Sequence, residues 1–186
     1  MRRVRRILSS IPKYLLWAVL STLFWLWIFT ILNDAPAEKK VTLYADVPVL
    51  ADPGLSVCLE QDLPEGIRMV RAHSFSYVMF GDAALTGADI FIVKGSDAER
   101  YRESFAPLPE AFAKRYPDAL SVNGSPSGIR VFDAETGTGA ACSYITYAEP
   151  GTAAEDYYLF FGAESLHCGR QDTAAYRIAE LFLQLP

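Results

Sequence analysis

Residues that build metal centres and redox sites are scarce in this sequence, which has two histidines and three cysteines among its 186 residues. Neither C-x-x-C nor H-E-x-x-H occurs, which excludes the common zinc and dithiol motifs. The G-x-S-x-G elbow of hydrolases is missing, and Gly137-Thr-Gly139 lacks the third glycine of a dinucleotide-binding loop. We therefore predict a non-catalytic protein with no metal and no cofactor.

The cysteines leave two interpretations open. Cys58, Cys142 and Cys168 lie at wide spacings. One disulfide between two of them is compatible with an oxidising compartment, whereas three reduced, buried thiols are the simpler alternative. His73 and His167 could join Cys168 as zinc ligands by residue type, but no paired spacing supports such a site.

One long apolar run dominates the amino-terminal part. Residues 14–32, YLLWAVLSTLFWLWIFTIL, contain no charge, glycine or proline. As a helix they would extend about 28 Å, close to the hydrocarbon thickness of a bilayer. Residues 1–13 carry five basic side chains and no acid, which favours a cytoplasmic amino terminus. We predict a single-pass cell-membrane anchor in contact with the lipid bilayer, with the rest of the chain outside the cytoplasm.

A cleaved signal peptide is the rival interpretation, because Ala35-Pro-Ala37 resembles a processing site. The apolar run is longer than the hydrophobic region of a signal peptide, which has about 7–15 residues. Trp17, Trp25 and Trp27 also suit an anchor that is retained. No cysteine follows the run closely, which argues against a bacterial lipoprotein.

Beyond this run, positive charge is in short supply. Residues 33–186 hold 12 Lys and Arg against 22 Asp and Glu. This excess of acid argues against nucleic acid as a partner and against binding to an anionic lipid surface. Residues 33–40 are polar and predict a linker, and residues 41–186 have the length of one domain with one core.

Strands and helical segments alternate in the first half of this domain. Strands are predicted at Val41–Val47, at residues 67–73 and at Ala88–Lys94, since each is short and rich in β-branched residues. Asp52, followed by proline, predicts a helix with an aspartate cap that runs to about Asp62. This alternation implies right-handed crossovers and a parallel sheet.

A helix is also expected directly after the third strand. Ser96 and Glu99 have the spacing of a capping box, and Pro107 stops the helix after Phe105. In the second half, SVNGSPSG at residues 121–128 predicts a turn-rich loop. The remaining predicted elements are a short helix at residues 109–117, strands at Ile129–Phe132, Cys142–Tyr147 and Asp156–Ser165, and a last helix at Asp172–Leu185.

The order of these segments resembles one lobe of an extracellular solute-binding protein of the ABC-importer type. The segments that carry the resemblance are KKVTLYADV, GIRMV, GADIFIVKGSDAERYRESFAPLPEAF and YYLFFGAESLHCG. The chain is also similar to single-helix membrane proteins of Gram-positive bacteria that are built from one such lobe. The resemblance implies an α/β fold class: an N-terminal transmembrane helix and one three-layer domain with a mixed, mostly parallel sheet.

Polar side chains at the ends of the predicted strands are the candidate site. In a parallel sheet the carboxyl ends of the strands meet at one edge, where ligands bind. Structural turn and helix caps are the alternative role for each of these side chains. The predicted ligand-binding residues are His73, Ser74, Tyr77, Ser96, Ser165 and His167, with Asp46 and Lys94 beside them.

Two functions follow from these expectations. The first is a membrane-anchored binding module that captures a small solute or peptide. The second is an envelope scaffold that docks another membrane protein through the cleft face of the lobe. A solute-binding protein closes two lobes on its ligand, whereas about 150 residues outside the membrane provide room for one.

Overall fold

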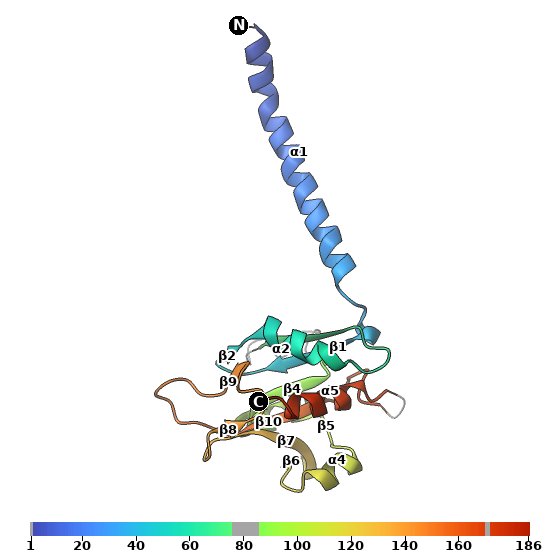
Figure 1. Ribbon diagram of the computed structural model, residues 1–186, viewed down its shortest axis with the longest axis vertical. Helices are drawn as coiled ribbons and strands as arrows, with labels where there is room; N and C mark the ends of the chain where they lie inside the picture. The colour runs from blue at the N-terminus through green and yellow to red at the C-terminus, as the bar shows by residue number, and fades with distance from the viewer. Residues whose placement is uncertain (1, 76–85, 170–171) are drawn as a thin grey trace. The chain divides into compact units, whose positions relative to one another are not determined.

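The computed structural model describes residues 2–75, 86–169 and 172–186 (Figure 1). The chain divides into two compact units, Met1–Pro36 and Ala37–Pro186. The boundary falls inside the predicted linker, whose last residues form a 3₁₀ helix, η1 (Ala37–Lys39), and the start of the first strand.

The first unit contains one helix, α1 (Arg2–Asn33), which begins well before the predicted residue 14 and includes Pro12. Its window Pro12–Phe29 has a mean hydropathy of 1.3 and is long and apolar enough to cross a membrane. The large apolar side chains of this window are exposed, for example Trp17 at 70% and Trp25 at 64%.

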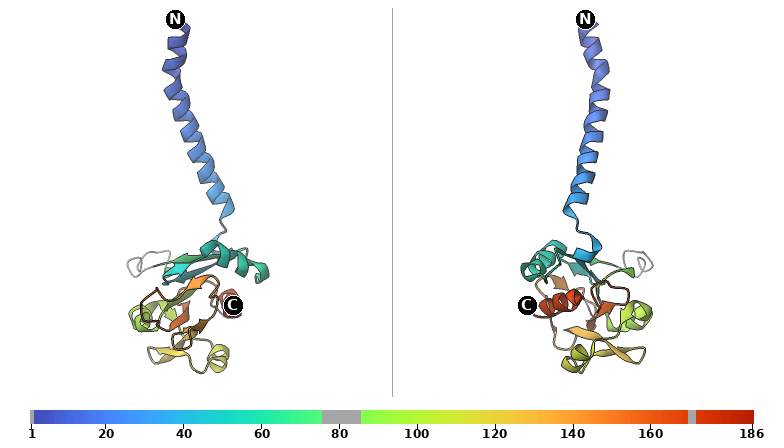
Figure 2. Two further views of the ribbon diagram at one scale, coloured as in Figure 1. Left: turned by 60° about the vertical axis from the view of Figure 1, so that its left-hand side comes forward. Right: turned by 90° about the vertical axis from the view of Figure 1, so that its right-hand side faces the viewer.

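The second unit is an α/β domain with a mixed sheet in the order β3-β1-β4-β10-β7-β6 (Figures 1 and 2). Strand β1 pairs in parallel with β3 and β4, and β10 pairs antiparallel with β4 and β7. The strands of this order are β1 (Lys40–Ala45), β3 (Met69–Ser74), β4 (Ile90–Lys94), β6 (Leu120–Val122), β7 (Ser125–Asp133) and β10 (Tyr157–Gly162).

The prediction of a mostly parallel sheet is wrong. Among the described strands of this sheet, two pairings are parallel and five are antiparallel, the latter including β5 (Phe105–Ala106) on β10 and β8 (Thr138–Gly139) on β7. The parallel pairing ends after β4. From β6 onward the chain forms hairpins, and it returns to β4 with β10 in the opposite direction.

Two apolar clusters cover the two faces of this sheet. Helices α2 (Asp52–Leu59) and α5 (Ala174–Leu183) lie on one face, and the 3₁₀ helix η4 (Gly95–Ser104) lies on the other (Figure 2). Strand β4 is buried on both sides, because Ile90 and Ile92 belong to the first cluster while Phe91 and Val93 belong to the second. The continuous apolar sequence of β4 reflects this central position.

Both predicted helix caps are wrong. Helix α2 begins at Asp52 itself, after Ala51, and a second 3₁₀ helix, η2 (Glu60–Asp62), extends it to the predicted end. Residues 95–104 form a 3₁₀ helix rather than an α-helix, with no side-chain cap at its start. The Ser96 hydroxyl instead donates to Glu155 Oε2 at 2.6 Å, so a distant loop replaces the local capping box.

The segment predicted as a turn-rich loop is a hairpin. Val122 pairs with Ser125, and the two residues between them, Asn123 and Gly124, have φ values of 55° and 74°. Positive φ at both central positions is the geometry of a type I′ turn, which Asn-Gly favours. The predicted helix nearby is α4 (Glu110–Arg115).

Of the predicted strand Cys142–Tyr147, only β9 (Ile145–Thr146) pairs, with β2 (Val49–Leu50). Residues before β9 form a turn in which Ala141 has a φ of 57°. The pairing of β2 with β9 brings the loop after β9 close to the loop after β1. Both loops therefore lie at the same edge of the domain.

Candidate functional site

The carboxyl ends of β1, β3 and β4 meet at one edge of the sheet. Ala45 is in register with Ser74 on one side and Ile92 on the other. Two cavities of about 400 and 490 Å³ lie beyond these ends. Pro48, Lys94, Glu149 and Tyr157 line both of them. We call the two cavities together the edge pocket.

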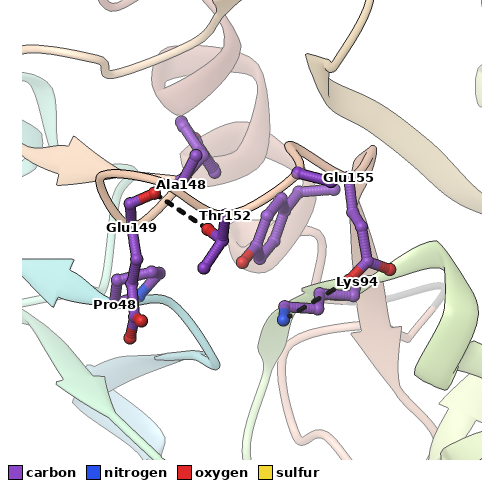
Figure 3. A pocket seen from close by; sticks show the side chains of 9 residues that line it. Pro48, Lys94, Ala148, Glu149, Thr152 and Glu155 are labelled. Atoms are coloured by element: carbon purple, nitrogen blue, oxygen red, sulfur yellow. Dashed lines mark hydrogen bonds and ion pairs between the residues drawn. The ribbon is translucent and has the colours of Figure 1, made fainter.

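The loop between β9 and β10 forms one wall of the edge pocket. Figure 3 shows Glu149 beside Pro48 on one side and Lys94 with Glu155 on the other. Both the backbone N–H and the hydroxyl of Thr152 donate to the Glu149 carbonyl, the hydroxyl at 2.8 Å, and so hold this loop in a tight turn. Residues from both halves of the chain therefore line the pocket.

Acidic side chains outnumber basic ones on the pocket wall. Asp46, Glu149 and Glu155 line it, with Lys94 as the basic lining residue. Lys94 Nζ lies 3.6 Å from Glu155 Oε1, and Ser96 occupies the other oxygen of Glu155. Within the described part of the chain, neither Asp46 nor Glu149 has an ion-pair partner within 4 Å.

Asp46 is in an environment that disfavours its charge. Burial raises the pKa of the Asp46 carboxyl, and nearby Asp97 raises it further, whereas Lys94 opposes the shift. Asp97 itself is paired with Arg100, at 3.5 Å. A carboxylate in this position gains stability from any additional positive charge.

The Tyr157 hydroxyl is the least satisfied polar group of the pocket. Tyr157 is 1% exposed, and its hydroxyl has no hydrogen-bond partner among the residues that the structure describes. Burial raises its pKa, and Asp46, Glu155 and Glu149 are the strongest charged contributors to that shift. The phenol therefore lies among the carboxylates of the pocket.

Two other tyrosines of the domain, Tyr147 and Tyr176, do not share this property. Tyr147, whose ring centroid lies 5.2 Å from that of Tyr157, donates to the Ala140 carbonyl at 2.7 Å. Tyr176 donates to the Cys168 carbonyl at 2.9 Å. Because buried hydroxyls are normally satisfied, the unpartnered Tyr157 hydroxyl points to an interaction with a group outside the described residues.

The predicted site residues divide between two places. Ser74 lines the edge pocket, and Ser96 reaches it through Glu155. Ser165 and His167 lie at the opposite edge, because β10 runs antiparallel to β4 and its end at Phe161 pairs with Ile90. Tyr77 lies outside the described residues.

A third cavity of about 310 Å³ runs from the opposite edge along β1 and β3, and we call it the amino-edge cavity. His73 and His167 both line it, together with Arg71 and Asp89. His73 stands over the Tyr44 ring at a centroid distance of 5.4 Å, and its Nδ1 lies 3.9 Å from Asp52 Oδ2. The two histidines thus line one cavity: His73 lies at the predicted carboxyl end of β3, whereas His167 comes from the opposite edge.

Ser165 and Asp89 are hydrogen-bonded to each other within the fold, so the Ser165 hydroxyl is not free to bind a ligand. The Ser165 hydroxyl donates to Asp89 Oδ1 at 2.5 Å, and the backbone N–H of Thr42 donates to Asp89 Oδ2 at 2.7 Å. The backbone N–H of His167 in turn donates to the Ser165 hydroxyl oxygen. These bonds join β1, the start of β4 and the segment after β10.

His167 is also held on both sides of its ring. It is 1% exposed, with Nδ1 at 2.8 Å from Asp172 Oδ2 and Nε2 at 3.0 Å from the Ala37 carbonyl oxygen. Both partners accept hydrogen bonds, which favours the doubly protonated ring. Burial alone would lower the pKa of His167, but the bonds to Ala37 and Asp172 outweigh it and raise the pKa.

Metal-ligand geometry is not present in the described part of the chain, where no three side chains of histidine, cysteine, aspartate or glutamate converge. Cys58, Cys142 and Cys168 are free thiols. Burial raises the pKa of the Cys168 thiol to about 12, which makes it a poor nucleophile at neutral pH.

Sequence reasoning missed the loop side of the edge pocket. Glu155 has the appearance of a solvated acid, and Tyr157 begins an apolar strand, so neither carries a local signal of a site. The pairing of Tyr157 with Lys94 places both residues beside Asp46. No known family model matches the chain, and the search of curated proteins finds no similar sequence.

Proposed function

We propose that this protein is a membrane-anchored binding module whose edge pocket captures a small solute. The observation that carries the proposal is the unpartnered, buried Tyr157 hydroxyl in a pocket at the carboxyl ends of parallel strands. Crevices at this end of the strands are the usual ligand sites of open α/β sheets. Each cavity also falls within the usual volume of small-molecule sites, about 300–1,000 Å³.

The anchor and the location belong to the same proposal. Helix α1 holds the domain at the cell membrane, and the basic residues before it keep the amino terminus in the cytoplasm. The domain is then extracytoplasmic, as in the solute-binding lobe that its sequence resembles. In this proposal the edge pocket replaces the predicted site at Ser165 and His167, whose side chains are engaged in the fold.

A ligand screen on the full chain in lipid nanodiscs tests this function. Sugars, amino acids, amines, short peptides and inorganic anions are added one at a time, and the unfolding midpoint of the domain is measured. A ligand at one hundred times its dissociation constant stabilises the folded state by about 2.7 kcal/mol. We expect at least one class to raise the midpoint.

A pair of variants connects any hit to the pocket. Ala153 lines the edge pocket, whereas its exposed neighbour Ala154 does not. Ala153→Trp should fill the pocket and remove the stabilisation, and Ala154→Trp should retain it. Absence of any stabilising ligand, or equal loss in both variants, would contradict the proposal and favour the scaffold alternative.

A further inference from the structure

The edge pocket has a charge pattern that selects among ligands, and the inference drawn from it rests on the proposed binding function. We infer that the ligand is a small organic cation that carries a primary ammonium group. Among the described lining residues, three carboxylates, of Asp46, Glu149 and Glu155, stand against the ammonium of Lys94. An anionic ligand would meet a net negative wall.

The basic side chain that the described part of the wall provides, Lys94, is already engaged. Lys94 lies 3.6 Å from Glu155, and Ser96 donates to the same carboxylate. Glu155 is therefore satisfied within the protein, which leaves Asp46 and Glu149 to interact with a ligand. Two carboxylates without an ion partner suit a donor with several N–H groups, and an ammonium has three.

Tyr157 adds a neutral acceptor between these charges. A phenol oxygen can accept one hydrogen bond from an ammonium and donate its own hydrogen to a carboxylate. Asp46, Glu155 and Glu149 are the charged groups that raise the pKa of this hydroxyl most. A bound ammonium would satisfy the buried hydroxyl and lower the cost of keeping Asp46 ionised.

A neutral ligand fits this arrangement less well. Hydroxyl groups could bond to Tyr157, but they would leave the charges of Asp46 and Glu149 without a counterion. Of the other charges near the pocket, Asp97 is already paired with Arg100. The surplus charge of the site is thus on Asp46 and Glu149.

Three probes of equal length separate the ligand classes. Putrescine, 1,4-butanediol and succinate share a four-carbon chain with ammonium, hydroxyl or carboxylate ends. Binding of each to the full chain in nanodiscs is measured by isothermal titration calorimetry at low and high salt. We expect putrescine to bind at least about tenfold more tightly than the other two, with an affinity that falls as salt rises.

Variants then assign the binding to named groups. Asp46→Asn and Glu149→Gln should each weaken putrescine binding by about tenfold or more, because each removes one carboxylate charge. Glu135→Gln is the matched control, since Glu135 is an exposed acid outside the pocket. Tyr157→Phe should weaken binding while leaving the unfolding midpoint unchanged, because it breaks no hydrogen bond within the described chain.

The outcomes distinguish this inference from the proposed function. Equal or tighter binding of succinate or 1,4-butanediol would overturn the inference, as would unchanged affinity in Asp46→Asn and Glu149→Gln. If another ligand stabilises the chain and Ala153→Trp abolishes that effect, the binding function stands and only the ammonium assignment fails.

Discussion

His167 links three separate segments through one ring. Its two nitrogens contact Asp172 at the start of α5 and Ala37 at the start of the domain, while its backbone N–H reaches Ser165. Both ring nitrogens of His167 are therefore used in hydrogen bonds that stabilise the fold. These bonds favour a structural role over the ligand-binding role expected from the sequence.

Replacing His167 should affect stability more than ligand binding. His167→Gln loses charge-assisted hydrogen bonds at a buried position, and we expect the free energy of unfolding to fall by about 2–4 kcal/mol. His73→Gln, at a half-exposed ring, should change it by less than about 0.5 kcal/mol. Urea denaturation of the full chain measures both, and equal losses would show that His167 is no more structural than His73.

The pH dependence of stability has a defined sign. The folded-state pKa of His167 is raised above 6.5, so its contribution is complete below the unfolded pKa and is lost as pH rises through the folded value. As the pH rises above about 6.5, the free energy of unfolding should fall more steeply in the wild type than in His167→Gln. Parallel profiles would contradict the charged state of this ring.

At the scale of elements, β10 decides where the sites lie. It pairs antiparallel with β4, so that its beginning at Tyr157 joins the edge pocket and the residues after its end form the amino-edge cavity. Sequence alone suggests a strand here, but not its direction. The direction of a strand depends on the strand beside which the chain returns to the sheet. The residues of the strand itself carry no pattern that specifies this.

The end of β10 also makes a close backbone contact. The N–H of Gly162 donates to the Asp89 carbonyl at 2.9 Å, and a Cβ added at Gly162 would lie 1.9 Å from the Ala88 carbonyl oxygen. This separation is far below van der Waals contact. Only glycine allows the two backbones to approach in this way.

Gly162→Ala should therefore destabilise the domain. Because backbone must shift to admit the methyl group, we expect a loss of at least about 1–3 kcal/mol in the free energy of unfolding. Gly169→Ala is the control, since a Cβ there meets no atom within 4 Å. Thermal or urea unfolding compares the two, and a Gly162→Ala protein as stable as Gly169→Ala would refute the close approach.

At the scale of the whole molecule, α1 and the α/β domain are separate compact units. The helix has no acidic or basic residue in Tyr14–Leu32, and its apolar side chains are exposed. Exposed apolar surface of this length suits lipid rather than water. The α/β domain carries the excess of acidic residues and the edge pocket.

Charges placed in α1 should release the protein from membranes. Leu20→Arg together with Leu23→Arg adds about 2.5–3.5 kcal/mol of insertion cost per residue near the centre of the helix. We expect the wild type to stay with membranes after alkaline extraction and the double variant to be recovered largely in the supernatant. The control, Val49→Arg with Val57→Arg at exposed domain positions, should behave as the wild type; retention of the Leu20/Leu23 variant would argue against a spanning helix.

The sequence by itself determined the features that depend on neighbouring residues. The apolar run, the strands β1, β3 and β4 and the last helix follow from local composition and periodicity, because burial of a segment imposes a pattern on that segment. The Ser74, Lys94 and Ser96 positions at strand ends follow for the same reason. Each could be placed without knowledge of the rest of the fold.

Only the tertiary structure decided the features that join distant segments. The bond from Ser96 to Glu155 replaced the local capping box, and the reversal of β10 moved Ser165 and His167 to the far edge. It also brought Tyr157 beside Lys94 and placed its hydroxyl among carboxylates. Pairings of this kind depend on competition among many long-range contacts. Such contacts produce no periodic pattern in the sequence of the residues that make them.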